Sequence, residues 1–220
     1  MPDIVSLKLL GVAGVLSYAA ARFATKAGII GYRRYILVSV PVSGMPDMPR
    51  GFSTRPIAAD ELRAHVIDVP EATQKDRFAQ GLTCLGAFNP KGALVGVTWV
   101  GSSDFTENEI QVRFALPQNA GWDCGLWIAP RYRLGRAFAA LWSGTANWMH
   151  ENGCDRSISW IADYNLPSLL SHRRMGADTI GYLTAFRFFN WQYIAQGKPR
   201  LLRVDPRYPT KFDLNSIAAN

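Results

Sequence analysis

The sequence has few of the residue types that build metal sites, disulfide frameworks or nucleophilic triads. Its 220 residues include only three cysteines and three histidines. Cys84, Cys124 and Cys154 are widely spaced and form no CxxC pair. This pattern argues against a disulfide framework and against a structural zinc site. We therefore expect reduced, largely buried thiols in a cytoplasmic protein that holds no metal.

Several short motifs with a known mechanism are missing as well. The chain contains no GxxxxGK[ST] phosphate loop, no GxGxxG, no GxSxG nucleophile elbow and no HExxH. Their absence argues against P-loop nucleotide hydrolases, dinucleotide-binding Rossmann enzymes, α/β-hydrolases and zinc proteases of that type. The sequence also has no internal repeat and no low-complexity tract.

The charge is unbalanced toward the positive side. Twenty-four lysines and arginines face 17 aspartates and glutamates, which gives a net charge of +7. This excess suits a phosphorylated cofactor, an anionic membrane surface or nucleic acid. Because the basic residues are spread along the chain without a lysine-rich tail, nucleic acid is the least favoured partner. With 48% hydrophobic residues, the chain can build one substantial core, with or without an appendage.

Residues 1–51 are expected to form an N-terminal apolar and basic helix followed by a linker. The uncharged stretch between Lys8 and Arg22 is shorter than the ~20 residues of a membrane-spanning helix. At about 100° per residue, Lys8, Arg22 and Lys26 fall on nearly one helix face beside a broad apolar surface. Such a helix can lie in an anionic membrane interface. It can equally pack on its own domain or on a second copy of the chain in a homodimer.

Residues 52–196 are expected to form the main domain, and residues 197–220 a proline-interrupted extension that wraps the domain or frays. Patterning predicts antiparallel hairpins first and then a strand–helix–strand–helix unit. This order predicts an α/β fold with a mixed, mostly antiparallel sheet and helices on both faces. The expected strands are 52–57, 82–88, 93–101, 109–117, 121–129, 156–162 and one or two over 179–194; the expected helices are 58–66, 72–81, 134–152 and 165–176.

The junction "CGLWIAPRYRLGRAFAALW", residues 124–142, carries the main functional signal. Pro130 ends a strand, and a helix begins within a few residues. The first helical turn leaves backbone N–H groups unpaired at the positive end of the helix dipole, so it can bind phosphate. Gly135 and Ala137 keep the backbone approachable, and charge-assisted donors come from Arg131, Arg133 and Arg136. An exposed arginine-rich turn without a ligand is the alternative.

The order of "GWDCGLWIAPRYRLGRAFAALW", "SISWIADYN" and "LPSLLSHRRMGA" resembles the GNAT acyltransferase superfamily, and "STRPIAADEL" is similar to its opening strand and helix. The resemblance covers roughly residues 52–190. It implies that acyl-CoA is the cosubstrate, with its diphosphate in the loop after strand four and its pantetheine arm in a cleft where strand four splays from strand five. Tyr132 departs from the Gln or Arg of the family pattern, and Gly176–Ala177 from its closing Gly–Phe.

The resemblance also implies the residues that contact acyl-CoA. The backbone N–H near Ile128 would polarise the thioester carbonyl, and Asn165 is the asparagine that follows strand five. The full set is Ile128, Arg131, Tyr132, Arg133, Leu134, Gly135, Arg136, Ala137 and Asn165.

Amine acylation requires a deprotonated amine and a protonated leaving thiolate. Asp123 is the only charge in a strand expected to be covered on both faces, so it is the first candidate for the general base. Bonding to nearby backbone or to an arginine is its alternative role. Members of the family often use a tyrosine as general acid four positions before the helix-ending glycine. His172 stands there in this chain, with Tyr164 and Glu109 in reserve; a solvated surface histidine is the alternative.

These features predict N-acyl transfer from acyl-CoA to a primary amine. Aromatic residues over 182–193, together with the N-terminal helix, extend the prediction to a long acyl group and a lipid-like acceptor at the inner membrane surface. Ceramide synthase-like and N-acyl amino acid synthase-like members of the family are precedents for a sphingoid or amino acid acceptor. The competing hypotheses are a catalytically silent GNAT-like module that binds CoA or a partner, and a basic membrane-associated scaffold.

Overall fold

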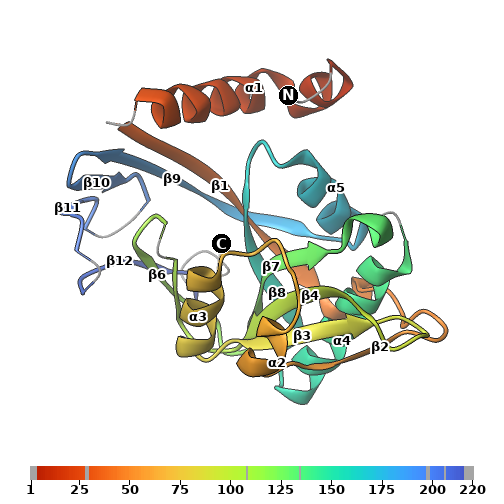
Figure 1. Ribbon diagram of the computed structural model, residues 1–220. Coiled ribbons are helices and arrows are strands. Elements are labelled where there is room, and N and C mark those ends of the chain that lie inside the picture. The colour runs from red at the N-terminus through yellow and green to blue at the C-terminus, as the bar shows by residue number, and fades with distance from the viewer. Residues whose placement is uncertain are drawn as a thin grey trace. The chain divides into compact units, whose positions relative to one another are not determined.

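The computed structural model describes residues 4–27, 30–107, 109–133, 135–196, 199–205 and 207–215. The chain forms two compact units, each built from segments distant in sequence. The first unit contains residues 1–39, 104–117 and 160–220, and the second contains residues 40–103 and 118–159. Figure 1 shows the helices and strands of both units and labels most of them.

The second unit is built on an antiparallel run of strands that ends in one parallel pair. The strands follow one another in the order β2 (Ser53–Pro56), β3 (Thr83–Phe88), β4 (Leu94–Gly101) and β7 (Ala120–Ile128), with the start of β8 (Arg156–Ala162) parallel to β7. A tight turn joins β3 to β4, in which the Gly92 N–H donates to the Asn89 carbonyl. Gly92 has a φ of +75°, which glycine adopts without steric cost.

Helix α4 (Arg136–Glu151) packs along β3 and β4 in the second unit. Its buried face includes Ala140 and Leu141, which join Ala87 and Val95 of the strands in one apolar cluster. At Gly144 the helix approaches β2 so closely that an added Cβ would lie 2.5 Å from Thr54 Oγ1. The remaining helical segments of this unit are η1 (Val42–Gly44), α2 (Ala59–Arg63), α3 (Glu71–Ala79) and η2 (Pro130–Tyr132).

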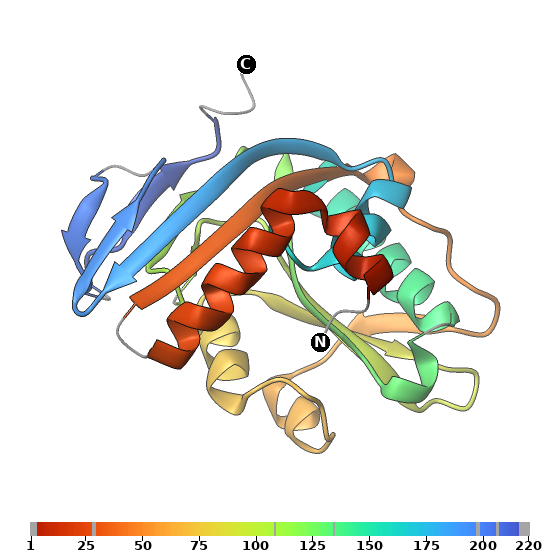
Figure 2. The ribbon, with the colours of Figure 1, turned by 90° about the horizontal axis from the view of Figure 1, so that it is seen from above.

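The first unit combines a longer antiparallel run with a small separate sheet. Within it, β1 (Ile30–Pro41), β9 (Asp178–Phe188), β10 (Trp191–Ile194) and β11 (Leu201–Arg203) pair in that order. The separate sheet contains β5 (Phe105–Glu107), β6 (Val112–Ala115) and β12 (Thr210–Asp213). The helices of this unit are α1 (Ile4–Ala27) and α5 (Leu166–Arg174), and Figure 2 shows α1 lying along β1.

Helix α1 packs on its own unit through one face. Ser17 Oγ donates a buried hydrogen bond of 2.8 Å to Asp163 Oδ1, and the rings of Tyr18 and Tyr164 meet edge to face at 5.7 Å. The opposite face is apolar and exposed, with Val12 79% and Leu16 64% accessible. In the described part of the chain, no helix is both long and apolar enough to span a bilayer.

The predicted fold class is confirmed: the structure is α/β, with a mixed and mostly antiparallel arrangement of strands and five α-helices among the described residues. Residues 30–41 fall inside the expected N-terminal appendage, yet they form β1 and pair with β9 over almost their whole length. Aromatic and β-branched residues such as Tyr35 and Val38 favour an extended backbone once a partner strand is present. The expected domain boundaries, 1–51, 52–196 and 197–220, stay a prediction.

Candidate functional site

The parallel ladder between β7 and β8 is short. In the described residues of these two strands, pairing runs from Ala120 and Arg156 to Trp122 and Ile158. Beyond that point β7 stays paired with β4 as far as Ile128. The backbone of β7 from Asp123 onward therefore lacks the continuous ladder that would join it to β8, as expected for a splayed pair.

A β-bulge lies in the same part of β7. Val97 and Trp99 of β4 face Trp127 and Cys124, so β7 contains one more residue than β4 over this interval. Gly125 has a φ of +67° and is exposed. Such a bulge interrupts the ladder and turns backbone groups away from their neighbours. It thus interrupts the regular pairing of β7 just where the strand leaves β8.

Asp123 lies directly at the point where the two strands separate. Its side chain is buried, with 8% of the residue accessible. Ser159 of β8 donates a hydrogen bond of 2.6 Å from Oγ to Asp123 Oδ2. A side-chain hydrogen bond thus joins β7 and β8 one residue beyond their last paired residues, Trp122 and Ile158.

The loop after β7 is compact and exposed. Pro130 opens η2, and the N–H groups of Tyr132 and Gly135 donate to the carbonyls of Ala129 and Tyr132. Gly135 is the N-cap of α4 and provides no side-chain cap. Because nothing on the N-cap side chain can satisfy the first-turn amides of α4, these donors suit an anion. Gly135 and Arg136 are both exposed, so an anion can approach them.

The loop side chains divide into a packed group and an exposed group. Tyr132 packs against the core cluster and accepts a hydrogen bond of 2.9 Å on its hydroxyl from Asn89 Nδ2. Arg133 Nε donates to the Ile128 carbonyl at 3.2 Å, which fixes the loop to the end of β7. Arg131 stacks on the Tyr132 ring at 5.0 Å. Ala137 is buried, and Leu134 lies outside the described residues.

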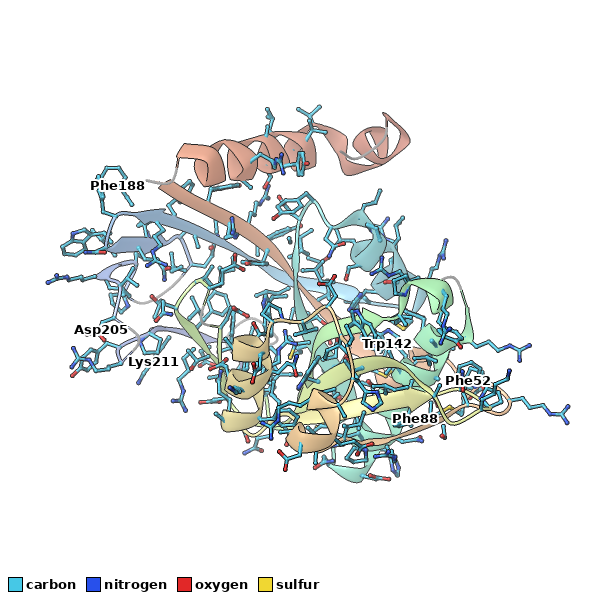
Figure 3. All side chains as sticks on the ribbon, viewed as in Figure 1. Phe52, Phe88, Trp142, Phe188, Asp205 and Lys211 are labelled. Carbon is cyan, nitrogen blue, oxygen red and sulfur yellow. The ribbon has the colours of Figure 1, made fainter. Side chains whose placement is uncertain are left out.

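The departure at Tyr132 from the family pattern therefore has a structural role: this side chain anchors the loop to the β3–β4 turn. Aromatic residues cluster at that end of the second unit, where Figure 3 labels Phe52 and Phe88. Arg131 and Arg136 remain exposed and carry the positive charge of the loop.

Three predicted site residues belong to the first unit. Asn165 caps α5, since its side chain accepts a hydrogen bond from the Ser168 N–H. His172 is buried at 7% accessibility, and its Nδ1 lies 2.8 Å from the Ser168 carbonyl. Tyr164 packs on Tyr18 of α1. The structure thus groups Asp123 with the loop before α4 (residues 129–136), called the phosphate loop below for its expected role, in the second unit, and groups Tyr164, Asn165 and His172 around α5 in the first.

The three cysteines are buried and form no disulfide, and all of them lie among the described residues. Burial raises the pKa of the Cys84 thiol to about 12, against a smaller opposing effect of the Arg77 charge. Such a thiol is a weak nucleophile at neutral pH. No cluster of three or more His, Cys, Asp or Glu side chains that could hold a metal occurs in the described part of the chain.

Two residues at this site had no signal in the sequence. Ser159 was one small residue within a predicted strand, and only the pairing of β7 with β8 places it against Asp123. Arg77 was one basic residue in a polar helix. In the structure it lies over the Trp99 ring and against Gly125.

No protein-family model matches the chain, and no curated protein matches it in sequence. Solved structures do match. A tandem GNAT protein from the clavulanic acid biosynthesis pathway is 17% identical with a TM-score of 0.50, over 80% of this chain and 58% of its own. A GCN5-related N-acetyltransferase from Kribbella flavida is 13% identical with a TM-score of 0.42, and the match covers 72% of this chain and 59% of that one. A phosphinothricin acetyltransferase from Sinorhizobium meliloti, solved with AcCoA, is 18% identical with a TM-score of 0.41. This match covers 57% of this chain and 74% of that one.

This chain spans just over half the length of two of the matched structures. At such identities the likeness concerns the fold. The chain itself has the short β7–β8 ladder and the exposed loop before α4 that the sequence resemblance implied. The resemblance that the sequence indicated is thus confirmed at the level of the fold: this protein has the fold of the GNAT acetyltransferases.

Proposed function

We propose that the protein transfers an acyl group from acyl-CoA to a primary amine. One observation carries this proposal: β7 separates from β8 and then leads, through an exposed loop, directly into the uncapped N-terminus of α4. A thioester lying along β7 and held by its diphosphate at this N-terminus would have its reactive carbon near the bulge. GNAT enzymes as a class use this arrangement, which supports the proposal by analogy of fold.

The donor set of the loop fits a diphosphate. Backbone N–H groups in the first turn of α4 supply uncharged donors at the positive end of the helix dipole. Arg131 and Arg136 are exposed beside them and can supply charge-assisted donors. Arg133 is already bonded to the Ile128 carbonyl, so its role is to hold the loop. The cosubstrate supplies the activated acyl thioester.

Asp123 is the proposed base. The amine nitrogen forms a bond to the thioester carbon, the carbon–sulfur bond breaks, and the amine proton passes to Asp123 directly or through water. The thiolate takes a proton from an acid, for which His172 and Tyr164 stay the candidates. The hydrogen bond from Ser159 Oγ orients the carboxylate through Oδ2.

We further propose a long acyl group and a lipid-like acceptor, a sphingoid or amino acid amine, used by a cytoplasmic protein lying peripherally on the inner membrane surface. Exposed aromatic residues at the β9–β10 hairpin support this, including Phe188 at 54%, Phe189 at 63% and Trp191 at 51% accessibility; Phe188 is labelled in Figure 3. The exposed apolar face of α1 adds Val12 and Leu16. Amphipathic surfaces of this composition, near Arg187 and Arg203, suit an anionic lipid interface.

A catalytically silent CoA-binding module is the second candidate. Two observations favour it: Tyr132 is committed to Asn89 and the core cluster, and His172 is committed to the Ser168 carbonyl. The first changes the loop relative to the family pattern, and the second engages Nδ1 of a candidate acid, so the site could bind a thioester without transferring its acyl group. A membrane-associated scaffold, in which the arginine loop binds lipid phosphates, is the third.

One experiment separates the three candidates. The unfolding temperature is measured with CoA, acetyl-CoA and palmitoyl-CoA, because ligand binding to the folded state stabilises it by RT ln(1 + [L]/Kd). Thiol release is then followed with a panel of primary amines. Stabilisation together with thiol release supports the enzyme. Stabilisation without thiol release for any amine supports the silent module. If neither stabilisation nor thiol release is observed, the enzyme and the silent module are both ruled out.

A further inference from the structure

Arg77 of α3 projects toward the bulge of β7. Its guanidinium carbon lies 4.6 Å from the centroid of the Trp99 ring. A Cβ added to Gly125 would lie 2.0 Å from Arg77 Nη1 and 2.4 Å from Nη2. The guanidinium is therefore held between an indole face on β4 and the bare backbone of the bulge. All three residues belong to the second unit, which also contains Asp123 and the phosphate loop.

The charge of Arg77 has no counterpart in the described part of the chain. Nη1 is buried and makes no hydrogen bond, and no described carboxylate forms an ion pair with this side chain. Helix α3 does contain an ordinary cation, Lys75, which pairs with Glu71 at 2.8 Å. A buried donor without an acceptor costs about 1–3 kcal/mol, and more when it is charged. Each such group in a folded protein therefore requires a specific cause.

The fold makes room for this cation. The bulge places Gly125 at a φ of +67°, a conformation that residues with a side chain rarely adopt. Any side chain at this position would also displace the guanidinium, as the distances to an added Cβ show. Trp99 contributes a cation–π contact that orients the guanidinium plane without neutralising its charge. The arrangement thus holds a positive charge in place beside the bulge of β7.

We propose that Arg77 binds the carboxylate of the acceptor, so that the acceptor is an amino acid whose amine is acylated. This inference rests on the proposed function and selects among its acceptors. A carboxylate matches the planar fork of a guanidinium with two parallel hydrogen bonds. A thioester carbonyl is uncharged and would leave the positive charge uncompensated.

The CoA diphosphate does not explain Arg77. It is assigned to the loop that starts after Ile128, whereas Arg77 touches the strand at Gly125. Four residues of extended strand from Gly125 to Ala129 separate the two positions by roughly 13 Å. Asp123, by contrast, lies two residues from Gly125 on the same strand. An amino acid carries its amine next to its carboxylate, so both of its groups can reach this short stretch of β7.

The test compares amino acids with their amides as acceptors. Glycine, leucine and phenylalanine and the three corresponding amides are supplied to the wild type with acyl-CoA, and thiol release is measured. We expect kcat/KM to be about 10- to 100-fold higher for the acids, the range of one charge-assisted interaction. Arg77→Gln should abolish this preference by lowering kcat/KM for the acids to about the value for the amides. Lys75→Gln on the same helix is the matched control and should keep the preference.

A second variant perturbs the guanidinium without deleting it. Gly125→Ala places a Cβ where the guanidinium lies, so it should also lower the preference for acids over amides. Arg77→Lys keeps the charge and loses the bidentate geometry, so a partial preference is expected. If the wild type uses acids and amides equally, or if Arg77→Gln slows both equally, the carboxylate assignment is overturned while the acyltransferase proposal stands.

A binding measurement covers the case in which no amine releases thiol. The same three amino acids are titrated, without acyl-CoA, into the wild type and Arg77→Met while the unfolding temperature is recorded. Stabilisation of the wild type by the acids but not by the amides, lost in Arg77→Met, supports the carboxylate site although the proposed transfer fails. No stabilisation by any acid, together with no thiol release, overturns both. Arg77→Met alone should keep or raise the unfolding temperature, because it removes a buried donor, Nη1, that has no acceptor.

Discussion

Ser159 Oγ donates a hydrogen bond of 2.6 Å to Asp123 Oδ2, and the two residues lie on β8 and β7 just past the last backbone pair that joins these strands. A side-chain hydrogen bond thus links the strands where the backbone ladder has stopped. The carboxylate is buried, yet it lies beside a part of β7 whose backbone is interrupted by a bulge. This relationship makes Asp123 the central residue of the proposed chemistry.

Replacing Asp123 by Asn should lower kcat/KM for amine acylation by about 10²- to 10⁴-fold, the contribution typical of a general base. Ser159→Ala should lower it by about 10-fold, because the carboxylate loses one orienting hydrogen bond. Affinity for CoA, measured by calorimetry, should stay unchanged in both variants, since the phosphate loop is untouched. Normal turnover by Asp123→Asn would show that the base has been misassigned.

Gly135→Glu should separate stability from ligand binding. A negative charge at the N-terminus of α4 interacts favourably with the helix dipole, so the unfolding temperature without ligand should stay equal or rise slightly. The same charge should repel a diphosphate and weaken CoA binding at least about 10-fold. Gly135→Ala is the control: an added Cβ meets nothing closer than the Tyr132 carbonyl at 3.5 Å, so CoA binding should be retained. Equal CoA affinity in both variants would place the diphosphate elsewhere.

Gly144→Val should destabilise the second unit by about 1–3 kcal/mol, as overpacking of a close contact does. Its side chain would be forced against Thr54 of β2, where even a Cβ lies 2.5 Å from Oγ1. Asn147→Val introduces the same side chain at an exposed position of α4 and should cost less than about 1 kcal/mol. Urea denaturation of both variants measures the difference, and similar free energies of unfolding would contradict the close packing of α4 on β2.

The stability of the first unit should depend on pH through Asp163. Burial raises the pKa of this carboxyl, against the opposing effects of the Ser17 hydrogen bond and the Arg34 charge. The folded state therefore keeps the proton to a higher pH than the unfolded state does. This contribution to the free energy of unfolding is fully present below the unfolded pKa and is lost as pH rises through the folded pKa.

Asp163→Asn should remove this contribution. The variant and the wild type should be closest in stability at acidic pH, and the variant should gain relative to the wild type as pH rises above the ordinary pKa of an aspartate. Urea denaturation across that range measures the difference. Ser17→Ala, which removes a group that lowers the pKa, should enlarge the pH dependence. A difference that stays constant with pH would contradict the assignment.

The membrane proposal predicts sedimentation of the intact protein with vesicles of phosphatidylserine and phosphatidylcholine. Binding should weaken with added salt, because screening shortens the reach of exposed charges to about 10 Å at 0.1 M. Leu16→Glu should reduce binding by placing a charge on the exposed face of α1. Val66→Glu makes the same change at an apolar side chain that is 98% accessible on the second unit and should bind as the wild type does. The proposal fails if the wild type does not sediment.

Local sequence patterns determined several elements of both units. Residues 134–152 predicted α4, which spans Arg136–Glu151 and is followed by Gly153 at a φ of +71°. The Asn89–Gly92 turn and the cap of α5 by Asn165 were equally predictable. In each case residues within one or two turns of one another supply the determining interaction: a cap, a tight turn or a periodic apolar face.

Residues distant in sequence decided the rest. β1 forms because residues 30–39 pair with β9, which lies about 150 residues later in the sequence. No local pattern encodes that pairing. The bulge at Gly125 depends on the register between β4 and β7. The contact of Ser159 with Asp123 and the position of Arg77 over Trp99 exist only after the sheet has assembled. The sequence by itself thus determined most helices and strands of the main domain and the exposed loop before α4, whereas tertiary structure alone decided which side chains meet at β7, because those contacts depend on strand pairing between remote segments.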